Sequence, residues 1–112
     1  MKKIEAIVRP LALEPLKEAL FQAGITGLTV SEVYGCGNQH GWKEYYRGRE
    51  VSVTTLPKVK FEVIVDDDQV DGIVEVIIAT TRTGEVGDGK IFVHPIEGVV
   101  RIRTGERDDA AV

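Results

Sequence analysis

The sequence contains one order of patterns twice, strand then helix then strand, and this duplication restricts the fold more than any other feature. In the first half, residues 3–9 largely alternate between the two faces of a strand. Residues 16–23 then carry apolar side chains at i, i+3, i+4 and i+7, which predicts an amphipathic helix that Gly24 would cap. Residues 28–34 predict a second strand, with an irregular alternation that suggests a bulge.

The second half repeats this order. Residues 58–65 alternate as a third strand, and the acidic residues 66–68 suit the start of a helix whose apolar face spans residues 70–78. After a glycine-rich loop, residues 90–94 predict a fourth strand and residues 99–103 a short additional one. Two such halves predict an α+β, ferredoxin-like βαββαβ sandwich, with both helices on one face of an antiparallel sheet.

Length and composition agree with a single domain over residues 1–112. The chain is 43% hydrophobic and 29% charged, which is ordinary for a globular protein. Its C-terminal residues, about 105–112, are mostly polar and are expected to be loosely held. Because so short a chain buries a small core, association between subunits would add stability.

The face of the predicted sheet that carries no helix combines charged and apolar side chains. A solvated face would seldom place isoleucines in its strands, and a buried face would seldom carry so many charges. Burial against a symmetric partner, with ion pairs across the interface, explains both, so the pattern predicts an oligomer. The alternative is a solvated face with two isolated isoleucines. The side chains concerned are Lys3, Glu5, Ile7, Arg9, Lys58, Lys60, Glu62 and Ile64.

Residues 37–57 lack periodicity and predict a long loop between the second and third strands of the sandwich. The segment contains Trp42, Tyr45 and Tyr46 beside charged residues, which suits contact with a partner protein better than exposure to water. The alternatives are a disordered insertion or a long hairpin. We expect a mobile loop that engages partners.

Charge and cysteine content argue against several classes of protein. The chain has 14 Lys and Arg against 18 Asp and Glu, a net charge of −4, which is unlike a general nucleic-acid binder. No apolar run approaches the ~20 residues of a membrane span, and Glu5 interrupts any secretory signal. The single cysteine, Cys36, excludes an internal disulfide and a multi-cysteine zinc site. We therefore expect a cytoplasmic protein without membrane insertion.

The segment Thr83–Lys90 is the strongest local signal for a ligand. Its glycines let backbone amides converge on an anion, and Lys90 adds a positive charge. The spacing resembles a Walker A loop, but Ile91 stands where Ser or Thr should hold magnesium, and the loop runs from helix to strand. A P-loop NTPase is therefore excluded, and a simple glycine turn is the alternative.

Arg101 and Arg103 strengthen the case for a phosphate ligand. Their spacing would place both guanidinium groups on one face of the last predicted strand, with Val100 and Ile102 buried behind. Adjacent arginines repel each other unless an anion lies between them, and their forks match phosphate oxygens. The alternative is a solvated edge strand. Together with the glycine loop, the pair favours polyphosphate binding.

Support for covalent catalysis is weak, and we expect no enzymatic activity. His94 ends a predicted strand, His40 lies in the long loop, and no acid–base dyad is evident from spacing. A phosphotransfer enzyme that uses His94 on the same fold is the alternative, although a lone strand histidine is more often structural. A related oligomer that binds a metal or amino acid, and no nucleotide, is a third possibility.

Several stretches carry a resemblance to a known family. The most specific is Thr83–Val93, and Met1–Ile7, Gly24–Val30, Tyr46–Gly48 and Arg101–Glu106 agree with it. Over essentially its whole length, the sequence resembles the PII nitrogen-regulatory signal-transduction proteins. The resemblance implies a trimer that binds ATP or ADP between neighbouring subunits. ATP with Mg²⁺ would complete a 2-oxoglutarate site, and the loop would dock on ammonium transporters or enzymes of nitrogen assimilation.

The resemblance also implies roles for particular residues. Gln39 would be the magnesium ligand that bridges to 2-oxoglutarate, and Lys58 would face the distal carboxylate of that ligand. One amide oxygen suffices, because Mg²⁺ takes few protein ligands beside phosphate oxygens. The other implied residues are Thr29 and Ile64 in the adenine and ribose wall, Gly37 and Gly41 in the 2-oxoglutarate pocket, and Gly87, Asp88, Gly89, Lys90, Arg101 and Arg103 in the phosphate cradle.

Three positions depart from the family pattern. Asn38 replaces a common arginine that contacts the terminal phosphate, which weakens charge neutralisation of ATP and bears on the preference between ATP and ADP. Val51 replaces a tyrosine that is often nucleotidylated, and Arg49 replaces a small residue that is often serine. We therefore expect neither modification at these two positions.

Overall fold

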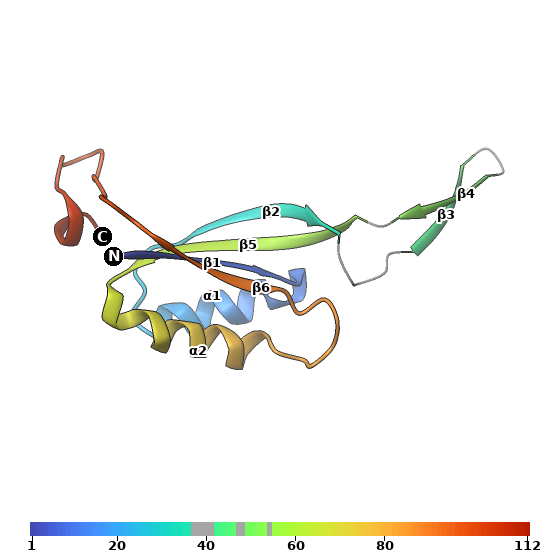
Figure 1. Ribbon diagram of the computed structural model, residues 1–112, viewed down its shortest axis with the longest axis horizontal. Helices are drawn as coiled ribbons and strands as arrows, with labels where there is room; N and C mark the ends of the chain where they lie inside the picture. The colour runs from blue at the N-terminus through green and yellow to red at the C-terminus, as the bar shows by residue number, and fades with distance from the viewer. Residues whose placement is uncertain (37–41, 47–48, 54) are drawn as a thin grey trace.

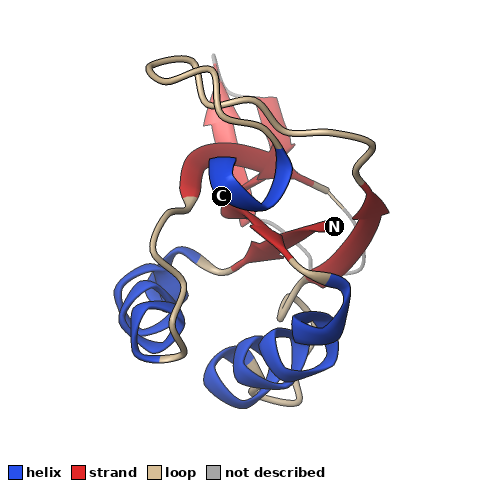
Figure 2. Ribbon diagram, turned by 90° about the vertical axis from the view of Figure 1, so that its left-hand side faces the viewer, coloured by secondary structure: helices blue, strands red, loops and turns tan. Residues whose placement is uncertain are grey.

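The computed structural model places a four-stranded antiparallel sheet at the centre of the chain, with strands in the order β2-β5-β1-β6 (Figure 1). Helices α1 (Leu13–Gln22) and α2 (Val70–Thr81) both lie on one face of this sheet (Figure 2). The predicted ferredoxin-like α+β fold is confirmed. The strands of this sheet are β1 (Lys2–Val8), β2 (Thr29–Gly35), β5 (Leu56–Val65) and β6 (Lys90–Pro95).

The core lies between the sheet and the two helices. Phe61, which is 2% exposed, pairs in register with the small Ala6, so that a large side chain lies beside a small one. The register between β2 and β5 runs without interruption from Thr29 opposite Glu62 to Gly35 opposite Leu56, so the predicted bulge is wrong. The other core side chains are Ile4, Val8, Leu16, Leu20, Ile25, Val59, Val63, Val65, Ile73 and Ile77.

The structure describes residues 1–36, 42–46, 49–53 and 55–112. Within the segment expected to lack secondary structure, β3 (Trp42–Tyr46) and β4 (Arg49–Val53) pair as a separate two-stranded antiparallel sheet. This hairpin projects from the end of the main sheet (Figure 1), and the molecule measures 58 Å along its longest axis. Of the alternatives for this segment, the long hairpin describes these residues best.

The open face of the sheet carries a connected set of ion pairs within one chain. Lys3 Nζ lies 3.4 Å from Glu62 Oε2 and 4.0 Å from Glu5 Oε2. Lys60 Nζ lies 3.7 Å from Glu62 Oε1, and His94 Nε2 lies 3.3 Å from Glu5 Oε2. Lys3, Lys60 and the two glutamates thus have partners inside the chain, and ion pairs across an interface stay a prediction.

The additional strand predicted for residues 99–103 is wrong. The chain turns back on itself here, through one isolated bridge between Val100 and Arg107, and then forms a short 3-10 helix over Asp108–Ala111. Val100 is 49% exposed and Ile102 is 99% exposed, so neither side chain is buried behind the arginines. An alternating sequence forms a strand only beside a second strand, and among the described residues this segment has one isolated bridge, between Val100 and Arg107.

Candidate functional site

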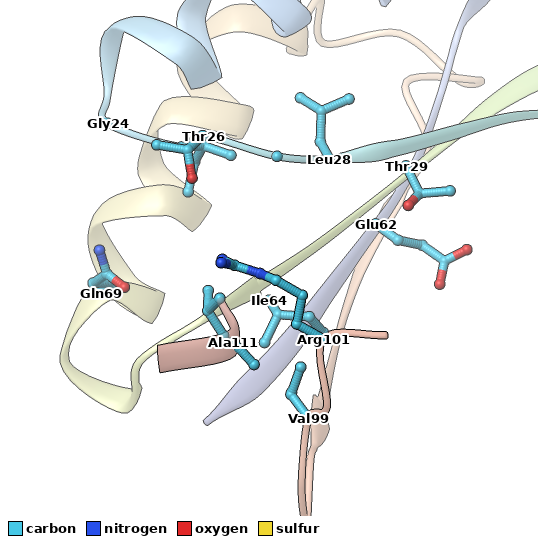
Figure 3. Close-up of a pocket in the computed structure, with 13 residues that line it drawn as sticks. Gly24, Thr26, Leu28, Thr29, Glu62, Ile64, Gln69, Val99, Arg101 and Ala111 are labelled. Carbon is cyan, nitrogen blue, oxygen red and sulfur yellow. The ribbon is translucent and has the colours of Figure 1, made fainter. Parts of the chain in front are cut away.

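A cavity of about 520 Å³ lies at the end of the sheet where β2 begins and β5 ends (Figure 3). Its wall comes from the turn between α1 and β2, from β5, from the start of α2, and from the C-terminal segment. Ile64 and Thr29, both predicted ligand contacts, line it. The remaining lining residues are Gly24, Ile25, Thr26, Gly27, Leu28, Glu62, Gln69, Val99, Arg101, Ala111 and Val112.

Arg101 is the cation of this cavity. Its side chain projects from the C-terminal segment into the cavity, toward the side that Gln69 lines (Figure 3). The backbone around it is fixed, because the Arg101 amide donates to the Glu106 carbonyl at 2.8 Å and the Gly105 amide donates to the Arg101 carbonyl at 2.7 Å. A guanidinium group held in a cavity of mixed polarity is suited to an anionic ligand with an apolar part.

The glycine loop between α2 and β6 is closed by the carboxylate of Asp88. This carboxylate accepts hydrogen bonds from the backbone amides of Thr83 (2.8 Å) and Gly84 (2.9 Å) and from the Thr83 hydroxyl. The bonds from the Thr83 hydroxyl and amide are the main causes that lower the pKa of Asp88 to about 2. The ionised Asp88 carboxylate thus holds the loop in shape. The positive charge that would attract an anionic ligand must therefore come from neighbouring side chains.

Gly89 permits the closest approach of the loop to the sheet. Its φ is +107°, and a Cβ atom at this position would lie 1.7 Å from the carbonyl oxygen of Ile7. Gly87 also has a positive φ of +104°. Both positions therefore require glycine, which accounts for two glycines of the motif.

Arg9 and Lys58 bind the glycine loop to the sheet. Arg9 Nη2 donates to the Val86 carbonyl at 2.6 Å, and Arg9 Nε lies 3.5 Å from Asp88 Oδ1. Lys58 Nζ donates to the Gly87 carbonyl at 3.1 Å. Desolvation, and next the charge of Arg9, lower the pKa of Lys58, whereas Asp88 opposes this shift. A cluster of cations thus surrounds a loop rich in backbone amides.

The cavity and the glycine loop lie at opposite ends of the same sheet. Lys58 and Ile64 lie on the same face of β5, six residues and about 20 Å apart along the strand. Lys90, at the end of the glycine loop, is in register with Ile7, whereas Ile64 is in register with Lys3. One chain therefore holds two separate groups of predicted phosphate contacts.

The family model for "Nitrogen regulatory protein P-II" matches residues 1–106 of this chain. The chain belongs to the P-II family. P-II proteins of Nostoc punctiforme and Synechocystis are 59% and 55% identical to it over 112 residues, with complete coverage of both chains. "Nitrogen regulatory protein P-II 1" of Escherichia coli K12 is 57% identical over the same length. The family name describes regulatory signalling proteins rather than enzymes.

In this P-II chain, the structure divides the predicted ligand residues into three sets. Thr29, Ile64 and Arg101 meet at the cavity, while Arg103 is exposed and does not line it. The second set lies in and around the glycine loop, at the end of the main sheet opposite the cavity. The third set lies outside the described residues. The second set comprises Lys58, Gly87, Asp88, Gly89 and Lys90, and the third comprises Gly37, Asn38, Gln39 and Gly41.

The cavity also contains residues that the sequence does not mark as ligand contacts. Glu62 was assigned only to the charged sheet face, yet its register opposite Thr29 brings it to the cavity. Gln69 shows a local signal, since its side chain accepts from the Asp66 amide at 2.9 Å in a capping arrangement. Ala111 and Val112 belong to the polar C-terminal segment, which lies against the cavity and forms part of its wall.

The two remaining questions raised by the sequence concern a metal site and His94. No group of three His, Cys, Asp or Glu side chains in it is placed to hold a metal ion. His94 pairs with Glu5 on the sheet face and lies near the Phe92 ring, with 6.5 Å between centroids. Among the described residues, no helix has the length and apolar character needed to cross a membrane.

Proposed function

We propose that this P-II protein is a trimeric signal-transduction protein that binds ATP or ADP between neighbouring subunits. The observation that supports this most directly is the separation of the two cationic groups by about 20 Å along the sheet. A nucleotide held by Arg101 in the cavity of one subunit can meet Lys90 and the glycine loop only if these come from a second subunit. A symmetric assembly repeats that junction at each interface.

The open sheet face suits burial in such an assembly. It carries Ile7, Ile64 and Phe92, the last of which is 43% exposed in the single chain. Lys3 and Lys60 are already paired with Glu5 and Glu62, so covering these four side chains does not leave them as isolated charges. A neutralised, partly apolar face of this kind costs less to desolvate than a face of unpaired lysines.

The resemblance to P-II relatives extends this proposal to 2-oxoglutarate and Mg²⁺. Gln39 would hold the metal beside the ATP phosphates, and Lys58 would face the distal carboxylate of 2-oxoglutarate. To act as a signal, 2-oxoglutarate must bind the ATP form better than the ADP form, because only a difference in affinity shifts the populations. Residues 37–57 would then present this state to an ammonium transporter or an enzyme of nitrogen assimilation.

Isothermal titration of 2-oxoglutarate tests the ligand site and its coupling together. We expect heat of binding in the presence of Mg-ATP, and none with ADP or without nucleotide. Equal binding under all three conditions would contradict the metal bridge. Absence of ATP and ADP binding in separate titrations would contradict the nucleotide site itself.

A further inference from the structure

We propose that Glu106 is a built-in competitor for the phosphate groups that Arg101 binds, and that it limits the nucleotide affinity of this site. The inference rests on the proposed function, because it concerns the same arginine. Glu106 Oε1 lies 3.4 Å from Arg101 Nη1, so one arm of the guanidinium fork already faces a carboxylate. The Arg101 side chain points into the cavity (Figure 3), whereas Glu106 lies beside it on the C-terminal turn and does not line the cavity.

The backbone keeps the two side chains together. The Arg101 amide donates to the Glu106 carbonyl, and the Gly105 amide donates to the Arg101 carbonyl, which closes a tight turn between them. The Thr104 hydroxyl accepts a further bond from the Glu106 amide at 3.2 Å. A phosphate group that reaches Arg101 can make the Glu106 side chain rotate away, but the Glu106 backbone stays beside the site.

The Glu106–Arg101 ion pair should weaken phosphate binding without preventing it. The two side chains are 39% and 44% exposed, so water screens their attraction and a phosphate can replace the carboxylate at low cost. A phosphate that binds Arg101 must nevertheless first displace this carboxylate, and the displaced charge stays attached to the same turn. Removal of that charge should strengthen binding of a phosphorylated ligand and leave binding of uncharged adenosine unchanged.

The test compares Glu106→Gln with the natural protein by titration of ADP, without magnesium and at low ionic strength. The variant keeps the size and the backbone bonds of the glutamate. We expect ADP to bind about two- to five-fold more tightly, the range that one exposed ion pair provides. Glu75→Gln makes the same chemical change on the exposed side of α2 and should leave the ADP affinity unchanged.

A double-mutant cycle shows whether Glu106 acts through Arg101. In an Arg101→Ala background, Glu106→Gln should give no further gain in ADP affinity. Unchanged or weaker ADP binding by Glu106→Gln, in a variant with the natural melting temperature, would overturn the inference while the nucleotide site stands. The inference would also be overturned if the gain persists without Arg101. A natural protein that binds no ADP would contradict the proposed function and this inference together.

Discussion

Lys58 donates a hydrogen bond from its ammonium group to the backbone carbonyl of Gly87, at 3.1 Å, and so joins the start of β5 to the glycine loop. The same lysine is the residue that the family resemblance places against 2-oxoglutarate. Lys58 therefore contacts the glycine loop, lies close to the base of the hairpin segment and belongs to the proposed ligand site. A ligand that draws Lys58 away from Gly87 would break this hydrogen bond and so change the glycine loop directly. Ligand binding and loop conformation would then be coupled through one side chain.

The tight packing of Gly89 against the Ile7 carbonyl predicts a large effect of one methyl group. Gly89→Ala would place Cβ against the Ile7 carbonyl and would hold alanine at a positive φ. We expect a loss of at least about 2 kcal/mol in the free energy of unfolding. Gly72→Ala is the matched control, because this exposed helix position has open space and alanine should stabilise it by about 0.5–1 kcal/mol. Equal urea midpoints for the two variants would contradict the assignment.

The hydrogen bonds to Asp88 predict a dependence of stability on acid pH. Because the pKa of Asp88 falls to about 2 on folding, its contribution is complete above the ordinary carboxyl pKa of about 4. That contribution is lost as pH falls from about 4 through about 2. Asp88→Asn should therefore flatten the fall of melting temperature in this window, whereas Asp109→Asn should leave it in place. A natural slope in Asp88→Asn would show that the loop does not depend on this charge.

The cavity predicts unequal roles for the two C-terminal arginines. Arg101 lines the cavity, and its removal should weaken ADP binding by about 1.5–3 kcal/mol, the value of a hydrogen bond to a charged group. Arg103 lies outside the cavity of the single chain, so any loss in Arg103→Ala would come from a contact that forms only in the assembly. Titration of ADP into both variants measures the difference. Full ADP affinity in Arg101→Ala would reject this cavity as the nucleotide site.

The role implied for Gln39 separates the metal from the nucleotide. Gln39→Ala should abolish binding of 2-oxoglutarate in the presence of Mg-ATP and leave ADP binding intact, because ADP alone does not require the bridge. Parallel titrations of both ligands into this variant provide the measurement. Equal losses for ADP and 2-oxoglutarate would show that Gln39 supports the nucleotide itself.

The periodic parts of the fold could be predicted because their pattern reflects burial directly. The alternation in residues 58–65 and the helical spacing in residues 70–78 each produce one apolar face, and both faces are buried in the same core. The secondary structure that each pattern favours is therefore also the one that tertiary packing favours. Residues 99–103 also alternate, yet a strand requires a neighbouring strand, and in the part of the chain that the structure describes this segment has one isolated bridge. The β3–β4 hairpin forms a two-stranded sheet of its own, whereas the sequence, which lacks periodicity here, favours a loop and offers a long hairpin only as an alternative.

The candidate site could be predicted only in part. The glycine loop was evident because its contacts are local, and Asp88 reaches residues only four and five positions earlier. The cavity joins Thr29, Ile64 and Arg101, which no spacing rule connects, and only the family resemblance placed them in one site. Ala111 reaches the cavity wall because the chain turns back near the C-terminus, and no periodic pattern in the sequence predicts that turn.

Mixing two variants that each bind ADP weakly tests the central claim, that two subunits together hold one nucleotide. Arg101→Ala removes the cation of the cavity, and Lys90→Ala removes a cation at the opposite end of the sheet. Each variant alone should bind ADP weakly. Co-expressed in equal amounts and assembled at random, they should regain natural affinity at roughly a quarter of the interfaces, where both intact halves meet by chance. Mixed assemblies that regain no tight ADP site would contradict a shared site and place the nucleotide within one chain.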